Sequence, residues 1–304
     1  MNIESTDLNL LKVFEALHEE GGASRASLRL GITQSAVSAA LARLRLVYSD
    51  PLFTRTGRGL APTERANELK PVVSDALNKI RLSLALASGQ THTFEGRTLS
   101  IGMSDDFEIA LGHRLIAAAT QRAPGLRLVF RQTHSRIVSD MLMRREIALA
   151  VTAGGATSRT LHRESFGEGR YCCVMDAGAP DMANPTMQVD DFMRHQHVLV
   201  SSGGYVGVVD EVLAALGLQR EVLASTTHFS ALPHLLRGTT AIATLPWHAA
   251  IALGEVSGMR VLACPLDMPR YPIELSWHKS ALRDPAADEI RAVAAQLLSD
   301  AHWR

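Results

Sequence analysis

The residues with the clearest chemical signature lie on a helix that the sequence predicts directly after Thr33. At about 100° per residue one side of this helix is apolar (Val37, Ala40, Leu41 and Leu44), and the other side carries Gln34, Ser35, Ser38, Ala39, Ala42 and Arg45. Small side chains and the absence of acids on that side permit close approach to the major groove of DNA. A glutamine amide can pair with adenine N6 and N7, and an alanine methyl group can touch the thymine methyl group. An ordinary solvated face would carry Glu and Lys instead, so the pattern favours contact with base edges.

Arginines surround this helix. Residues 20–60 contain two acids and six arginines, a local balance of +4: Arg25, Arg29, Arg43, Arg45, Arg55 and Arg58. Guanidinium groups suit phosphates and, on a wing, the minor groove. The whole chain of 304 residues balances 31 basic against 31 acidic side chains. This balance excludes a protein whose entire surface attracts polyanions, and any such site must be local.

Helix signals position these side chains. Thr6 or Asp7 can cap a first helix, which ends at Gly21-Gly22, and a short second helix from about Ser24 to Leu30 stops at Gly31. Thr33 then caps the third helix, which runs to about Arg45. Two short helices joined by a tight glycine-containing turn form a helix-turn-helix. Two brief extended pieces around Arg58 follow, and they predict a small β-hairpin, or wing.

A longer helix is predicted from about Thr63 to Ala87. Its apolar residues are spaced by threes and fours: Leu69, Val73, Ala76, Ile80 and Leu84. Such a stripe favours pairing with a second copy of the helix over packing on its own domain, because no nearby segment supplies the other half of a core. Pro71 is expected to kink the helix near its start. Residues 88–95 are polar and turn-prone, as in a linker.

Beyond the linker, short β-rich runs alternate with helical segments for about 200 residues. Predicted strands are 99–102, 127–131, 148–152, 171–175, 197–201, 222–225 and 241–245, and predicted helices are 107–122, 135–145, 206–216 and 229–237. The alternation predicts α/β units with mostly parallel sheets, and its length favours two lobes over one.

Six motifs of the first 63 residues resemble one known family. They are Asp7-Leu-Asn-Leu-Leu-Lys-Val-Phe14, Ser24-Arg-Ala26, Leu30-Gly-Ile-Thr-Gln-Ser-Ala-Val-Ser38, Leu41-Ala-Arg-Leu44, Asp50-Pro-Leu-Phe-Thr-Arg55 and Pro62-Thr63. Together they resemble the winged helix-turn-helix of LysR-type transcriptional regulators. Asp7-Leu-Asn-Leu-Leu11 and Ser104-Asp-Asp106 are similar to the branch that holds nodulation regulators and activators of multidrug efflux.

The resemblance covers the whole chain and implies a domain plan. A winged helix-turn-helix would occupy residues 1–62, and a linker and dimerisation helix with a hinge residues 63–94. A two-lobed α/β effector domain like the periplasmic binding proteins would take residues 95–304, with lobe I at about 95–166 and 268–304 and lobe II at about 167–267. The family also implies binding to an interrupted inverted repeat in promoter DNA as a homodimer or homotetramer. RNA polymerase is left open as a further partner.

The DNA-contacting residues follow from the exposed helix face, the arginines and the resemblance. The candidates are Arg25, Thr33, Gln34, Ser35, Ser38, Ala39, Arg43, Arg45, Arg55 and Arg58. Two positions depart from the family. Ser35 stands where proline is usual, which restores an N–H group and adds a hydroxyl. Ala39 replaces a longer polar side chain, so DNA shape is expected to supply more of the specificity.

The effector-contacting residues are expected beyond the carboxyl ends of the predicted strands, between the lobes. The candidates are Ser104, Asp105, His134, Ser135, Thr152, Ser201, Ser202, Gly203, Thr227, His228 and Phe229. Asp105 and Asp106 either cap the helix that starts near Phe107, the favoured interpretation, or face the effector. In the second case they would disfavour carboxylate effectors.

Other chemistry finds little support. The twelve histidines lack zinc-ligand spacing, no Gly-x-x-x-x-Gly-Lys phosphate loop occurs, and Ser201-Ser-Gly-Gly204 lacks the nucleophile elbow of hydrolases. We therefore predict no enzyme, no metal and no cofactor. Three cysteines (Cys172, Cys173 and Cys264) make no disulfide framework, and the pattern favours buried thiols over a redox switch.

The compartment follows from two further patterns. The longest uncharged stretch, 238–254, contains a proline and a histidine and is too short to span a membrane. Acids stand near the N-terminus, where a signal peptide would carry basic residues. The prediction is a cytoplasmic, sequence-specific regulator whose DNA binding responds to a small molecule. Two alternatives stay open: a constitutive silencer or architectural protein without an inducer, and an enzyme or solute-binding protein with a helical appendage.

Overall fold

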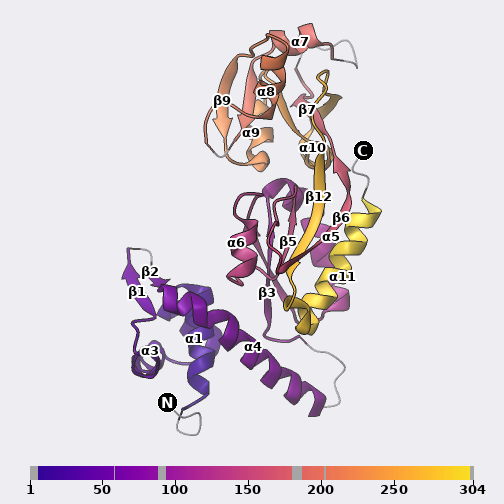
Figure 1. The fold of residues 1–304 in the computed structure, drawn as a ribbon. Coiled ribbons are helices and arrows are strands. Elements are labelled where there is room, and N and C mark those ends of the chain that lie inside the picture. The colour runs from indigo at the N-terminus through magenta and orange to yellow at the C-terminus, as the bar shows by residue number, and fades with distance from the viewer. Residues whose placement is uncertain (1–5, 58, 88–93, 180–186, 202, 302–304) are drawn as a thin grey trace. The chain divides into compact units, whose positions relative to one another are not determined.

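The chain folds into two compact units, residues 1–93 and residues 94–304 (Figure 1). The computed structural model describes residues 6–57, 59–87, 94–179, 187–201 and 203–301. Arg58, Ser202 and most of the predicted linker lie outside the described residues.

The first unit is a winged helix-turn-helix followed by a long helix. Its elements are α1 (Asn9–Glu20), α2 (Ala23–Leu30), α3 (Gln34–Tyr48), β1 (Phe53–Thr56), β2 (Gly59–Pro62) and α4 (Glu64–Ala87). Strands β1 and β2 pair in an antiparallel hairpin, as predicted for the wing. Helix α3 runs about one turn beyond the predicted end at Arg45.

The helix ends follow the local sequence signals. The Thr33 hydroxyl accepts the backbone N–H of Ala36 at 3.2 Å, which confirms the predicted cap of α3. Gly21 and Gly31 close α1 and α2 with φ near +62° and +65°, a left-handed conformation that glycine adopts without steric cost. At the start of α1 the Asp7 carboxylate accepts the backbone N–H of Asn9 at 3.0 Å. Local hydrogen bonding therefore sets these boundaries.

Helix α4 divides its apolar stripe between two environments. Val73 is buried and Leu69 packs against the core of its own unit, which Phe14, Leu44 and Phe53 also build. The expectation that the whole stripe awaits a second copy is therefore wrong for its first half, because α1 and the wing complete that part of the core. Ile80 and Leu84 are 42% and 67% exposed. Only this second half of the stripe is left for a partner.

Lobe I of the second unit is built on a five-stranded sheet in the order β4-β3-β5-β12-β6. The strands are β3 (Thr98–Met103), β4 (Arg127–Gln132), β5 (Leu149–Thr152), β6 (Leu161–Gly169) and β12 (Tyr271–His278), and the helices are α5 (Asp105–Arg122), α6 (Val138–Met143), η3 (Ala281–Arg283) and α11 (Pro285–Asp300). Strand β3 runs parallel to β4 and β5, whereas β12 runs antiparallel to both of its neighbours. Phe107 and Ile290, from α5 and α11, are fully buried in its core. The buried Phe94 also joins this core, so the predicted linker ends before it.

Lobe II contains an antiparallel sheet β10-β7-β11 and a parallel pair β8-β9. The strands are β7 (Tyr171–Asp176), β8 (His197–Val200), β9 (Val222–Thr226), β10 (Ala243–Pro246) and β11 (Met259–Ala263), and the helices are α7 (Val189–Arg194), α8 (Val208–Ala215), η2 (Phe229–Ala231), α9 (Leu232–Leu236) and α10 (Trp247–Ser257). The expectation of mostly parallel sheets is therefore wrong. The strand by which the chain enters each lobe runs antiparallel to its neighbours: β7 in lobe II and β12 in lobe I.

The chain passes between the lobes at two neighbouring points (Figure 1). Strand β6 ends at Gly169, and after Arg170 the chain continues as β7 in the other sheet. Strand β12 returns the chain to lobe I, and its first residue, Tyr271, pairs with Gly169. A Cβ atom on Gly169 would lie 2.2 Å from the Tyr271 ring, so only glycine permits this approach. Within the described residues no helix is long and apolar enough to cross a membrane.

Candidate DNA interface and interlobe site

The exposed face of α3 is the one that the sequence predicts. Val37, Leu41 and Leu44 are buried, and the opposite side is exposed along its length: Gln34, Ser35, Ser38, Ala39, Ala42 and Arg45. The Ser35 hydroxyl lies 2.9 Å from Thr33 Oγ1, so the serine at the helix start is hydrogen-bonded to the hydroxyl that caps α3. The face therefore presents an amide, two hydroxyls and methyl groups, a set that suits base edges.

The predicted arginines differ in their hydrogen-bond and ion-pair partners. Arg45 donates to the backbone carbonyls of Pro51 and Phe53, each at 2.9 Å, and thereby ties the end of α3 to the wing. Arg25 donates to the carbonyl of Glu20 at 2.6 Å, and Arg43 pairs with Asp7 at 3.2 Å on the surface. Both of these side chains remain exposed, as does Arg55 on β1.

A hollow of about 590 Å³ lies between the C-terminal end of α3 and the wing. It is lined by Arg45, Leu46, Ser49, Asp50, Pro51, Phe53, Thr54 and Arg55. The Asp50 carboxylate is engaged by the backbone N–H of Leu52 at 2.6 Å and by the Thr63 hydroxyl at 2.8 Å. The Asp50 carboxylate thus stabilises the turn into the wing. Arg45 and Arg55 give the hollow its positive character.

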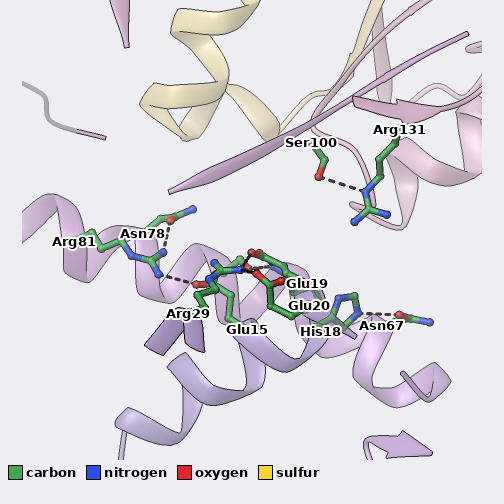
Figure 2. A network of polar contacts seen from close by, with 12 residues as sticks. Glu15, His18, Glu19, Glu20, Arg29, Asn67, Asn78, Arg81, Ser100 and Arg131 are labelled. Carbon is green, nitrogen blue, oxygen red and sulfur yellow. Dashed lines mark hydrogen bonds and ion pairs between the residues drawn. The ribbon is translucent and has the colours of Figure 1, made fainter. Parts of the chain in front are cut away.

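A partly buried polar network joins α1, α2 and α4 (Figure 2). Glu15 is 5% exposed and accepts from Arg81 Nη2 at 2.6 Å and from Ser74 Oγ at 2.9 Å. Glu19 accepts from Arg29 and from Lys70, each at 2.6 Å.

The charges of this network stabilise the contact between α4 and α1. Burial alone would raise the pKa of Glu19, but the two cations outweigh it and hold that pKa below its ordinary value. Helix α4 is therefore fixed to α1 by partly buried ion pairs as well as by apolar packing. Sequence reasoning missed the network because two of its cations, Lys70 and Arg81, come from a helix far along the chain from α1.

In the second unit, two of the predicted loops meet. Asp105, on the first turn of α5, accepts from the backbone N–H and the hydroxyl of Ser230 at 3.2 and 3.4 Å. His228 Nδ1 lies 3.9 Å from the same carboxylate oxygen. Lobe I and lobe II are thus joined through the loops that follow β3 and β9, and Phe229 begins the short helix η2 that packs against α5. Ser104 occupies the N-cap position of α5.

The neighbouring aspartate is buried in the same junction. Asp106 is 5% exposed, and its Oδ2 lies 3.1 Å from Nε2 of His248 on α10. The His248 ring stacks on Phe107 at 4.5 Å, and its Nδ1 lies 3.4 Å from the Tyr271 hydroxyl. That hydroxyl donates to the carbonyl of Arg170 at 3.3 Å. One buried polar cluster therefore links α5, α10 and both strands that pass between the lobes.

Electrostatics keep the Asp106 carboxyl ionised in this cluster. Burial alone would raise its pKa, but the hydrogen bond and charge of His248 and the hydrogen bond from the Ser104 hydroxyl lower it below the ordinary value. Burial raises the pKa of Tyr271, which stays a neutral hydroxyl.

The capping interpretation of the two aspartates needs correction, and the effector interpretation stays open for Asp105 only. Helix α5 begins at Asp105 with Ser104 as its N-cap, so neither aspartate is the cap residue. Asp106 faces His248 and is not available to an effector. The sequence gives no signal for a polar role of His248, because this residue stands alone within an apolar stretch.

The other predicted effector residues form two local groups. At the end of β5, Thr152 is 1% exposed and donates to the carbonyl of Gly154 at 2.8 Å, so it shapes the turn and does not face solvent. The Ser135 backbone lies against Gly155, and His134 Nδ1 accepts the N–H of Arg136 at 3.3 Å.

The second group lies at the ends of β8 and β9. The Ser201 N–H donates to the Thr226 carbonyl at 2.8 Å, and the Ser201 hydroxyl accepts from Gly203 N–H at 3.3 Å. Thr227 is exposed beside them. Across the described part of the chain, no group of His, Cys, Asp and Glu side chains could hold a metal ion.

Comparisons with known proteins agree with this architecture. Residues 8–67 match the model of the bacterial regulatory helix-turn-helix protein of the lysR family, and residues 92–299 match the LysR substrate binding domain. The chain is 30% identical to the HTH-type transcriptional activator NagR of Ralstonia sp, over 99% of this chain and 100% of NagR. It is 28% identical to Nodulation protein D 1 of Bradyrhizobium japonicum, over 97% and 92% of the two chains.

A solved structure extends the likeness to the fold. The crystal structure of the probable transcriptional regulator PA0477 from Pseudomonas aeruginosa superposes with a TM-score of 0.69 and 30% identity, over 96% of this chain and 98% of that chain. The family models cover both units, and the relatives match along nearly their whole length. The chain belongs to the LysR family of transcriptional regulators, with a DNA-binding helix-turn-helix and an effector-binding domain.

Proposed function

We propose that this regulator reads promoter DNA through Gln34, Ser35, Ser38 and Ala39 of α3, and that a small molecule bound between the lobes changes this binding. The observation that carries the DNA half is the division of α3 into a buried apolar side and an exposed side without acids. Ala39 lets the helix approach a thymine methyl group closely, and Gln34 is the side chain that can pair with adenine.

Phosphate contacts would come from the arginines around α3. Arg55 and the hollow between α3 and the wing offer a positive surface to the DNA backbone, and Arg25 and Arg43 remain exposed nearby. Arg45 would act by holding the wing in place, because its guanidinium already donates to two carbonyls. Arg58 is proposed as a wing contact from its sequence position alone.

The exposed second half of the α4 stripe supports a homo-oligomer. Ile80 and Leu84 present apolar surface that a second copy of α4 would cover, and a dimer would place two α3 helices on the halves of an inverted repeat.

The effector half of the proposal rests on the junction between the lobes. Asp105 holds Ser230 across it, and His228 lies beside the same carboxylate. An effector that binds one arrangement of the lobes better than another shifts the equilibrium by the difference in binding free energy. The contact face would be the loops after β3, β8 and β9, with Ser104, Asp105, Ser201, Gly203, Thr227 and His228 as candidates, and those after β4 and β5 with His134 and Ser135.

One experiment tests the DNA half. The full chain and its Gln34→Ala and Ser38→Ala variants are mapped on genomic DNA in vitro at two salt concentrations. Each base-reading contact is worth about 1–3 kcal/mol, so we expect specific affinity to fall roughly 5- to 150-fold while binding to random DNA persists. Arg65→Ala is the matched control, since Arg65 is exposed and pairs only locally with Glu68 at 3.1 Å. Equal losses on all sequences would overturn the assignment of Gln34 and Ser38 to base contacts.

The same mapping separates the inducible regulator from a constitutive silencer. Substrates and products of the enzymes encoded next to the bound sites are added one by one, and the unfolding midpoint of the full chain is followed. A metabolite that raises the midpoint and shifts DNA occupancy supports the effector half. Occupancy that no bound metabolite changes would favour the silencer.

A further inference from the structure

Polar contacts tie helix α4 to helix α1 over about four turns of α4 (Figure 2). They join His18 to Asn67 at 3.0 Å, Glu19 to Lys70 at 2.6 Å, Glu15 to Ser74 at 2.9 Å and Glu15 to Arg81 at 2.6 Å. As α4 proceeds, its partners move back along α1, so the two helices run in opposite directions. Because the contacts are spread along both helices, they oppose tilting of α4 on α1 as well as sliding.

Arg81 makes its contact where the apolar packing of α4 on its own unit has already ended. Leu77 is 5% exposed and belongs to the core of the first unit, whereas Ile80 and Leu84 are exposed. Arg81 lies between these two exposed residues in the sequence, and its guanidinium reaches the buried Glu15. Among the α4 side chains that the structure describes, Arg81 is the last one with a polar contact to α1. This ion pair therefore holds the exposed part of α4 to α1.

Helix α1 links α4 to the reading helix, because it contacts both α4 and α3. Phe14 and Leu17 of α1 are fully buried in the same core as Val37 and Leu44 of α3. Glu15 is the residue next to Phe14 on α1. The direction of the exposed part of α4 relative to α3 is thus fixed through α1.

We propose that Arg81 and Glu15 are positioning residues that set the spacing at which the two α3 helices of a dimer read DNA. This inference rests on the proposed dimer, in which a second copy of α4 covers the exposed Ile80 and Leu84 beside Arg81. With the ion pair in place, that surface keeps one direction relative to α3, and the dimer accepts one separation of the half-sites. Without the ion pair, α4 can rock about its buried Val73.

A small tilt of α4 is enough to change the spacing. Lys70 and Ser74 lie within about one turn of Val73, so they resist rocking about it less than Arg81 does. The end of α4 lies about 20 Å beyond Val73 at about 1.5 Å per residue, so a tilt of about 10° moves that end by about 3.5 Å. Successive base pairs of B-DNA are about 3.4 Å apart along the axis, so loss of the ion pair should widen the accepted spacing by at least about one base pair.

The test measures the DNA affinity of the full chain against spacer length. The inverted repeat found in the genomic mapping is rebuilt with its spacer unchanged and with one or two base pairs removed or added, and a further probe keeps a single half-site. For the unaltered chain we expect affinity to fall at least about tenfold when the spacer changes by two base pairs, because a rigid dimer then cannot engage both half-sites. Arg81→Met and Glu15→Gln should each lose less than about threefold over the same change. Their affinity for the single half-site should stay within about twofold of the unaltered chain, since neither residue reads a base.

Lys79→Ala is the matched control and should keep the steep dependence on spacer length, because Lys79 is 73% exposed and pairs with Asp75 within α4. A steep dependence in both Arg81→Met and Glu15→Gln, or equal flattening in Lys79→Ala, would overturn the proposal. So would a loss of single half-site affinity in step with a lower unfolding midpoint, since that result marks a purely structural role. Equal affinity of the unaltered chain for every spacer would instead refute the proposed dimer on an inverted repeat, and this inference with it. If one of the two variants fails to fold, the other removes the same ion pair and decides the question.

Discussion

Removal of the His248 imidazole should destabilise the second unit strongly. In His248→Ala the Asp106 carboxylate stays in a site where the residue is 5% exposed, and it loses the ring nitrogen 3.1 Å away. The Ser104 hydroxyl still reaches it, but leaving a buried carboxylate charge without its main partner generally costs about 3–5 kcal/mol. Loss of the ring that stacks on Phe107 adds to this cost. We therefore expect the free energy of unfolding to fall by about 4 kcal/mol.

Tryptophan fluorescence in a urea titration measures this loss in the right unit, because all three tryptophans belong to residues 94–304. His228→Ala is the matched control: His228 lies 3.9 Å from Asp105 but its side chain is 58% exposed. An exposed pair of this kind is worth at most about 0.5 kcal/mol. Adding Asp106→Asn to His248→Ala should recover at least about 1 kcal/mol, since the unpaired charge is then gone. A loss below about 1 kcal/mol in His248→Ala, or equal losses in the two histidine variants, would refute the reasoning.

Two further predictions concern other buried ionisable groups. Burial lowers the pKa of His197 from 6.5 to about 4, so the unfolded chain binds a proton that the folded chain excludes. Stability of the second unit should thus be complete above pH 6.5 and fall by about 3 kcal/mol as pH drops through 4, a slope that His197→Phe removes and tryptophan fluorescence in urea measures. A slope unchanged in that variant would contradict the assignment. In the first unit, Arg81→Ala leaves the buried Glu15 with weaker partners and should destabilise the unit by about 2 kcal/mol in circular dichroism melts. Lys79→Ala, whose side chain is 73% exposed, should change stability by less than about 0.5 kcal/mol, and similar effects of the two variants would exclude an anchoring role for Glu15.

Local signals in the sequence predicted much of the first unit correctly. Thr33, Gly21 and Gly31 act within a few residues of themselves, and their hydrogen bonds and left-handed backbone appear where expected. The buried and exposed sides of α3 followed from the helical period alone. The alternation of strands and helices over about 200 residues likewise predicted two α/β lobes, because the spacing of apolar residues identifies strands and helices locally.

Contacts between distant segments were beyond such reasoning. Asp106 reads in sequence as a helix-start residue, and only the tertiary structure brings His248 against it. Arg45 reads as a DNA contact in the sequence, and only the tertiary structure shows that its guanidinium also donates to the wing backbone. The antiparallel strand pairing in the second unit was missed, because strand direction there depends on how the chain passes between the lobes.

By itself, then, the sequence determined the helix caps, the reading face of α3, the family and the two-lobed class, because each depends on residue types at short spacing or on motifs. The tertiary structure decided which charges are buried and with what partner: Glu15 with Arg81 and Asp106 with His248. The physical reason is that the protonation and reactivity of a group depend on its desolvation and on charges within a few ångströms. Those neighbours come from segments whose proximity no local pattern specifies.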